Sequence, residues 1–288
     1  MEAGAQPTEG SDAPVRLEVI VCGVDSSPES LEATRQALSV GDPGAQLTAV
    51  AVWDPGLAMH GGIHAADVAR RFRGEAVSAL QEAEEAVPGL RTTLFKGRDV
   101  SGLISAARDL NADLVSVGSH GTSRTAGVLI GSVATAMVQH APCSVLIARR
   151  PPEGESFPRH ILHAGDGSPD SVDAARVAAR IAARHDATLL SLHVGDEADR
   201  TALSEESVAL IEAGGPEPVI RTESGSPHRL IPEVAEEVGA SLIVIGSRGQ
   251  TGLKALGSVS ERVAHSAACS VLIVRRPTHP VEEPGGEA

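Results

Sequence analysis

Short apolar runs alternate with amphipathic runs along the whole chain. The apolar runs are typical of buried strands, and the stretches between them repeat their apolar residues at helical spacing. In the first half the pattern predicts strands at 17–24, 47–53, 91–96, 113–117 and 144–148, and helices at 26–39, 65–87, 100–110 and 133–140. In the second half it predicts strands at 161–165, 188–194, 219–222, 241–245 and 270–274, and helices at 168–185, 200–213, 227–238 and from 258 onward. This alternation predicts an α/β fold with two tandem, doubly wound, five-stranded parallel sheets of the Rossmann-like kind.

The two halves also repeat each other in sequence. The segment Asp25-Ser26-Ser27-Pro28 matches Asp166-Gly167-Ser168-Pro169 at an offset of 141 residues, whereas Cys143-Ser144-Val145 matches Cys269-Ser270-Val271 at an offset of 126. The second copy is therefore about 15 residues shorter. Prolines and glutamates gather near residue 155 and indicate a linker. The predicted organisation is a disordered tail at 1–15, domains at 16–150 and 159–276, a linker at 151–158 and an acidic tail at 277–288.

Composition narrows the class of protein. A chain of 288 residues has room for two domains of about 100–150 residues each. With three Phe, one Trp and no Tyr, the cores must be aliphatic. The net charge of −14 argues against attraction to nucleic acid or to an anionic membrane. No apolar run reaches the ~18–20 residues that span a bilayer, and the first 13 residues lack the features of a signal peptide. The sequence predicts a soluble, cytoplasmic protein.

One stretch carries the candidate chemistry of the first half. Gly118 and Gly121 follow a predicted strand, and Gly131 and Ser132 open the next helix, with Ser132 near its N-cap. Glycines let the backbone approach a ligand closely, and the first amides of a helix have no internal partner and favour an anion. Asp25 ends the first strand, so it would lie at the same edge of the sheet. The arrangement predicts a phosphate cradle. A helix cap at Asp25 and close helix–strand packing at Gly131 are the alternatives without a ligand.

At this point the sequence resembles the universal stress protein family, in the tandem form with two domains in one chain. The ATP-binding members carry the pattern Gly-x2-Gly-x9-Gly-(Ser/Thr), which the first copy has in full. The resemblance implies an adenine-nucleotide alpha hydrolase-like fold that binds ATP, with or without Mg²⁺. It also implies that an aspartate after the first strand and a second-strand backbone contact the nucleotide. The implied binding residues of the first copy are Asp25, Val52, Gly118, Gly121, Gly131, Ser132 and Val133.

The second copy departs from this pattern. Only seven residues separate Gly249 from Gly257, so its loop would wrap phosphates differently. His163 also stands in the first strand where an apolar residue is usual. Binding by this copy is therefore left open. The residues that the resemblance implies for it are Asp166, Val194, Gly246, Gly249, Gly257, Ser258 and Val259.

The remaining sequence patterns give weaker evidence about function. The chain has no Gly-x4-Gly-Lys-(Ser/Thr), no Gly-x-Gly-x-x-Gly after the first strand and no Gly-x-Ser-x-Gly. Four groups keep two interpretations each. His60 and His64 are a zinc pair or exposed loop histidines, and Arg124 and Lys254 are phosphate contacts or exposed cations. Asp166, Asp170 and Asp173 are a metal cluster or, for the last two, the first turn of a helix. Cys22, Cys143 and Cys269 are free buried or half-buried thiols or redox groups.

The resemblance predicts a nucleotide-binding regulator of a stress response rather than an enzyme. It implies that the two domains associate through their last strands as an intrachain pseudo-dimer, and it allows a further homodimer. The regulatory partner and the stress are not identified by the sequence, nor is ATP separated from other adenine nucleotides. The alternatives are an interaction module of the same fold without a nucleotide, and a slow ATPase.

Overall fold

The computed structural model describes residues 14–58, 64–121, 130–152, 154–195, 200–249 and 257–277. We call residues 16–150 the first repeat and 159–276 the second. The first repeat contains β1 (Val19–Gly23), α1 (Pro28–Val40), β2 (Gln46–Trp53), α2 (Pro55–Ala58), α3 (Ala65–Ala86), β3 (Arg91–Lys96), α4 (Asp99–Asp109), β4 (Leu114–Gly118), α5 (Ser132–His140) and β5 (Ser144–Ala148). The second contains β6 (His160–Gly165), α6 (Pro169–His185), β7 (Thr188–Val194), α7 (Arg200–Glu212), β8 (Val219–Glu223), α8 (Pro227–Glu237), β9 (Leu242–Gly246), α9 (Ser258–Ser266) and β10 (Ser270–Val274).

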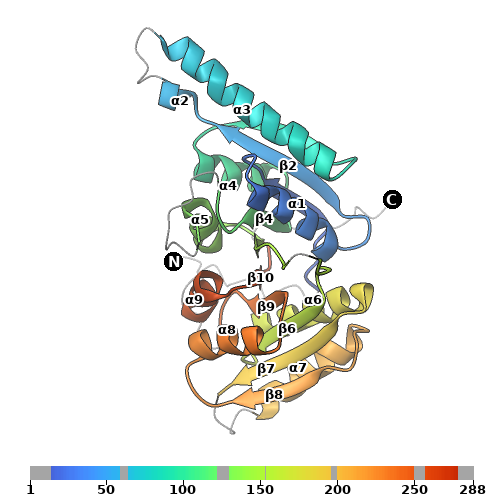
Figure 1. Ribbon diagram of the computed structural model, residues 1–288. Helices are drawn as coiled ribbons and strands as arrows, with labels where there is room; N and C mark the ends of the chain where they lie inside the picture. Colours follow the sequence, from blue (N-terminus) through green and yellow to red (C-terminus); the bar gives the residue numbers. More distant parts are fainter. Residues whose placement is uncertain are drawn as a thin grey trace, which may run out of the picture.

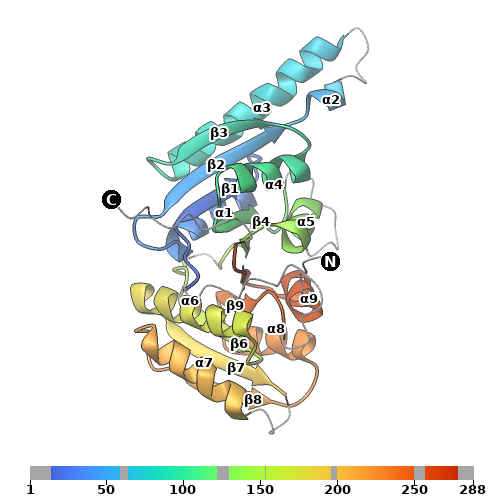
Figure 2. The same cartoon turned by 180° about the vertical axis from the view of Figure 1, so that it is seen from behind.

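All described strands belong to one ten-stranded sheet in the order β3-β2-β1-β4-β5-β10-β9-β6-β7-β8. Within each repeat the pairs are parallel, which confirms the predicted fold class. The last strands β5 and β10 pair antiparallel, as the resemblance implied, and join the two halves seen in Figures 1 and 2. The two predicted sheets are thus one continuous sheet.

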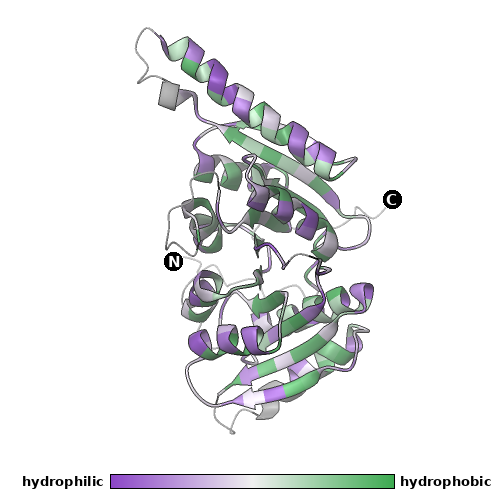
Figure 3. Ribbon diagram, in the orientation of Figure 1, coloured by the Kyte–Doolittle hydropathy of each residue, from purple (hydrophilic) through white to green (hydrophobic). Residues whose placement is uncertain are grey.

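Helices cover both faces of this sheet. One apolar cluster includes residues of α1, α3, α6 and α7, and a second, on the other face, includes residues of α4, α5, α8 and α9. Apolar colour follows the strands in Figure 3, and polar colour follows the outer side of α3. The clusters consist mainly of Val, Leu, Ile and Ala, as the composition predicted. Among the described helices, none has the length and apolarity needed to cross a membrane.

Two arginines reinforce the junction of β5 and β10. Arg149 follows β5 and donates to the carbonyl of Ala264 in the last turn of α9 (2.6 Å) and to that of Cys269 just before β10 (3.0 Å). At the equivalent place after β10, Arg275 donates to the carbonyls of Ala141 and Val138 at the end of α5. Each guanidinium therefore caps a helix of the other repeat, where a cation is favoured by the helix dipole.

The predicted element boundaries need few corrections. The short helix α2 occupies the segment where the sequence predicted only a turn. The N-cap of α5 is Gly131, and Ser132 is the first helical residue rather than the cap. Val15, assigned to the disordered tail, is buried, and its carbonyl accepts from Nη2 of Arg180 at 2.7 Å. The remainder of both predicted tails, 1–13 and 278–288, lies outside the described residues.

Candidate functional site

Each repeat has a cavity at the carboxyl ends of its first and fourth strands, where the strand order reverses. The cavity of the first repeat measures about 250 Å³ and that of the second about 320 Å³. Such a switch point is where open α/β sheets bind their ligands. The first cavity is lined by all the residues predicted for the first copy, namely Asp25, Val52, Gly118, Gly121, Gly131, Ser132 and Val133. The second is lined by all those predicted for the second copy, namely Asp166, Val194, Gly246, Gly249, Gly257, Ser258 and Val259.

The helix that starts at each cavity leaves its first amides without a side-chain acceptor on the N-cap. Gly131 is the N-cap of α5 and Gly257 that of α9, so neither offers a side-chain oxygen. By contrast, α1 is capped by Ser27, whose Oγ accepts from the amide of Ser30 at 3.1 Å. The first-turn N–H groups of α5 and α9 are therefore suited to an anion.

Different structural constraints explain the three glycines of the first cavity. A Cβ on Gly118 would come within 2.7 Å of the backbone of Glu29, so glycine there lets the strand end pass close to α1. On Gly121 it would overlap Oδ2 of Asp25. On Gly131 it would keep an ordinary 3.5 Å from the carbonyl oxygen of Ser119 and 3.9 Å from the amide of Gly121. Packing therefore does not require glycine at 131, and a Cβ would stand in the cradle between loop and helix. The space fits a ligand.

The position of Asp25 is compatible with both roles considered for it, the cap before α1 and the contact with a ligand. Its Oδ1 accepts from the amide (3.1 Å) and the hydroxyl (2.5 Å) of Ser27, which fixes the turn before α1. Its Oδ2 faces Gly121 across the cavity wall. In the second repeat Oδ1 of Asp166 accepts from the amide of Ser168 at 3.0 Å. Capping the turn thus orients each carboxylate beside its glycine loop.

Asp170 holds the glycine loop of the second repeat, a role that sequence reasoning missed. Its buried carboxylate accepts from Oγ of Ser247 at 2.6 Å and from Nε of Arg248 at 3.2 Å. The neighbouring Asp173 is also buried and pairs with Nε of Arg276 at 2.7 Å. Asp170 lies in the first turn of α6, as predicted, whereas Asp173 lies in the next turn, and both carboxylates accept from arginine side chains. Within the described ranges, no three His, Cys, Asp or Glu side chains are placed to hold a metal ion.

His163 is fully buried in β6. Its Nδ1 lies 3.0 Å from Oγ of Ser191, and its Nε2 lies 3.2 Å from the carbonyl oxygen of Ser171. Burial lowers the pKa of His163, so the ring is neutral at pH 7. This residue, which the sequence marked as unusual for a strand, belongs to a buried polar group beside the second cavity.

The cysteines are buried or half-buried, as the sequence indicated. Burial raises the pKa of Cys22 and of Cys143 to about 12, and that of Cys269 to about 11. Thiols with such pKa values are not thiolates at neutral pH, which favours a structural role. His60, Arg124 and Lys254 lie outside the described residues, so their two interpretations stay open.

The fold and the paired cavities define a tandem α/β protein of the adenine-nucleotide alpha hydrolase-like class. The model of the universal stress protein family matches residues 17–149, 158–212 and 196–275. A universal stress protein of Mycolicibacterium smegmatis is 31% identical over 89% of this chain and 96% of its own length. The crystal structure of a universal stress protein from Archaeoglobus fulgidus is 25% identical, with a TM-score of 0.70 over 90% of this chain and 99% of that one. The chain belongs to the universal stress protein family.

A further solved structure is a universal stress protein in complex with cAMP. It is 31% identical to this chain, with a TM-score of 0.37, and it covers 41% of this chain and 96% of its own.

Proposed function

We propose that this chain is an ATP-binding universal stress protein that regulates a stress response through its bound nucleotide, with little or no turnover. The observation that carries the proposal is the cavity in which Asp25, the glycine loop and the N-terminus of α5 meet. A Cβ on Gly131 would enter this space without a clash, which leaves the cradle open to phosphate. The same arrangement occurs in the second repeat.

The roles follow from the chemistry of each group. Asp25 would accept hydrogen bonds from a ribose hydroxyl or from the adenine amino group, and the backbone of Val52 would contact the base edge. Gly118 and Gly121 would lie along the ribose and the first phosphate. The outer phosphates would bind at the first turn of α5, with or without Mg²⁺.

Slow turnover is expected because the cradle consists mainly of backbone amides and a hydroxyl. Such groups bind negative charge, but they neither take a proton from water nor supply the lysine of a P-loop, a motif that the sequence lacks. ATP would then act by its presence, biasing a surface that a partner protein contacts.

The sharpest test replaces the first residue of each helix by aspartate. Ser132 of α5 and Ser258 of α9 are exposed and line their cavities. A carboxylate at this position repels phosphate, yet it interacts favourably with the helix dipole by about 0.3–1 kcal/mol. S132D and S258D should therefore lose nucleotide at one site each without loss of thermal stability. S78D, which adds the same charge on an exposed part of α3, serves as the control.

Isothermal titration with Mg-ATP should give two sites in the wild type and in S78D, one in S132D and in S258D, and none in the double variant. Phosphate release under excess ATP should stay far below one turnover per minute. Absence of binding to the wild type would refute the proposal and favour the interaction module. Steady phosphate release that S132D abolishes would favour the slow ATPase.

A further inference from the structure

The linings of the two cavities correspond position by position, with one addition in the second, although the residue types differ at places such as Asp99 and Pro227 or His120 and Arg248. Every residue that lines the first has an equivalent in the second, and the second adds His193. His193 precedes Val194 as Ala51 precedes Val52, and the pairing registers of β7 and β2 place His193 and Ala51 at equivalent positions. His193 is 3% exposed, and among the residues that the structure describes neither of its ring nitrogens has a hydrogen-bond partner. A buried imidazole without partners at the edge of a cavity indicates a missing ligand group.

A buried carboxylate stands close by. Glu206 of α7 is 1% exposed, and its Oε1 accepts from the amide of Gly167 (2.7 Å) and from the hydroxyl of Ser171. Its Oε2 has no hydrogen-bond partner within the described part of the chain. A Cβ on Gly165 would overlap this carboxylate, whereas the equivalent residue of the first repeat is Val24. At the position where the side chain of Val24 lines the first cavity, the second repeat therefore has the carboxylate of Glu206.

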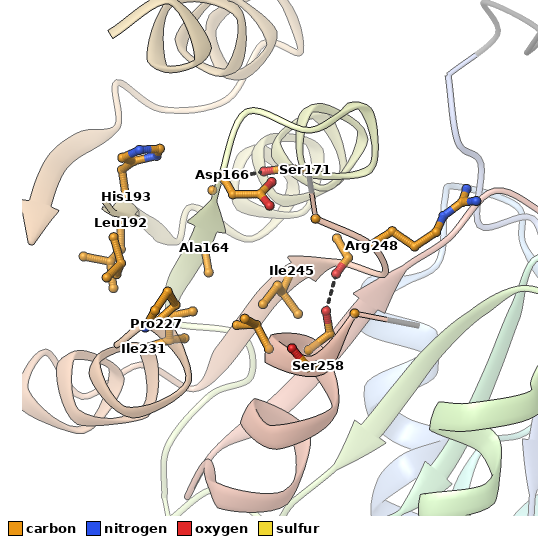
Figure 4. A pocket seen from close by; sticks show the side chains of 17 residues that line it. Ala164, Asp166, Ser171, Leu192, His193, Pro227, Ile231, Ile245, Arg248 and Ser258 are labelled. Carbon is orange, nitrogen blue, oxygen red and sulfur yellow. Dashed lines mark hydrogen bonds between the residues drawn. The ribbon is translucent and has the colours of Figure 1, made fainter. Parts of the chain in front are cut away.

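Among the side chains that the structure describes, no arginine or lysine forms an ion pair with Glu206. His163 of β6 lies near enough to Glu206, Asp166 and His193 to interact with them electrostatically, and its ring is neutral at pH 7 because burial lowers its pKa. Asp166 adds a second carboxylate to the same region. The unpaired Oε2 therefore lies in a negative, poorly hydrated place, where a hydrogen-bond donor is the favoured partner. In Figure 4 the imidazole of His193 lies on the same side of the strand ends as Asp166, whereas Leu192 points toward Ile231.

We propose that Glu206 and His193 form a polar annex of the second cavity that binds a hydrogen-bond donor of the nucleotide, either a ribose hydroxyl or an exocyclic amino group. The inference rests on the proposed function. The first repeat has no such annex, because Ala51 and Val24 occupy the equivalent positions. The second repeat thus recognises a donor group of the nucleotide with two side chains that the first repeat lacks.

The test isolates the second site in the S132D background and titrates four nucleotides. ATP is compared with 2′-deoxyATP, 3′-deoxyATP and purine riboside triphosphate, which lacks the amino group. A hydrogen bond to a charged group corresponds to about a tenfold to hundredfold change in Kd. One analogue should lose about that factor relative to ATP. Which analogue does so distinguishes the two hydroxyls from the amino group.

The loss must then depend on the annex. H193A introduces the first-repeat residue, and E206Q can keep an oxygen as the acceptor for Gly167 while an amide nitrogen replaces the unpaired Oε2. In both variants the ratio of the Kd values for that analogue and for ATP should fall toward one. A purely structural role would weaken all four nucleotides equally and leave the ratios unchanged. The S258D background, with the first site alone, should show the same ratios with and without H193A.

Unchanged ratios in H193A and in E206Q, with thermal stability retained, would overturn the proposal. Binding at the first site with none at the second would overturn it as well, while the proposed function would stand. Absence of binding at both sites is the failure of the proposed function itself, and the annex proposal falls with it.

Discussion

The cap that Arg275 places on α5 offers a quantitative prediction about the junction of the repeats. Its guanidinium donates to the carbonyls of Ala141 and Val138, and the residue is 8% exposed. In a continuing helix the carbonyl of Val138 would accept a hydrogen bond from the backbone N–H four residues later. That residue is Pro142, which has no N–H. R275M keeps the apolar stem and removes both hydrogen bonds. The two carbonyls then lose a donor that nothing in the helix replaces.

The magnitude follows from two opposing contributions. Two hydrogen bonds from a charged donor are worth about 1.5–3 kcal/mol each, or about 3–6 kcal/mol together. Against this, burial disfavours the charged guanidinium and lowers the pKa of Arg275. Its Nε is also buried without a partner, which costs about 1–3 kcal/mol. We expect R275M to lower the free energy of unfolding by about 2–3 kcal/mol, or the Tm by roughly 5–10 °C.

Urea unfolding followed by circular dichroism measures this change. R149M removes the equivalent cap from α9, and because Arg149 is only half-buried the loss should be about 1–2 kcal/mol. R150M, at an exposed neighbour, is the control and should stay within about 0.5 kcal/mol of the wild type. If R275M is no less stable than R150M, the reasoning about the cap is refuted. A larger loss in R149M than in R275M would contradict the ranking by burial.

Three other measurements test the packing and the buried titratable groups. G165A should lower the unfolding free energy by about 1–3 kcal/mol, because the new methyl group overlaps the carboxylate of Glu206. Adding E206A to the same chain should recover much of this loss. Strictly additive losses would show that residues 165 and 206 do not touch. The three thiols should react slowly with a thiol reagent at pH 8 unless the chain is unfolded. Because their pKa values are raised from 9.0, the stability they contribute is complete below pH 9 and is lost as the pH rises toward 11 to 12. The pKa of His163 is lowered from 6.5, so the stability that the neutral ring contributes is present above pH 6.5 and is lost as the pH falls. H163C, which introduces the first-repeat residue, should therefore make the urea midpoint less dependent on pH between pH 6.5 and about 5. An unchanged slope would contradict this.

Much of the fold was predictable because its signals are local. Helical and strand periodicity, with Pro and Gly at the ends of runs, placed β5, β7 and β10 at the residues where the structure has them. The repeat in sequence showed that two similar units follow each other. The glycine loops and the aspartates after β1 and β6 gave the cavity-lining residues, because the carboxyl ends of parallel strands meet at one edge of a sheet.

Other features follow from contacts between segments far apart in the sequence. The comparison of repeats shows Gly165 where Val24 stands, and His193 where Ala51 stands. It does not show that Glu206, on a helix of different length and register, lies against Gly165. Similarly, Asp170 was predicted on the first turn of its helix, but its bonds to the glycine loop depend on how α6 packs against β9.

By itself, the sequence determined the order of strands and helices, the duplication and the residues at the two cavities, since each depends on periodicity or on turn residues within a few positions. Tertiary structure decided that the two sheets become one and that Arg149 and Arg275 cap helices of the opposite repeat. It also decided that the second cavity, unlike the first, has a buried imidazole in its lining and a buried carboxylate packed against its lining residue Gly165. These features depend on distances between side chains brought together by the antiparallel pairing of β5 with β10 and by the packing of α7 on the sheet, which no local pattern encodes.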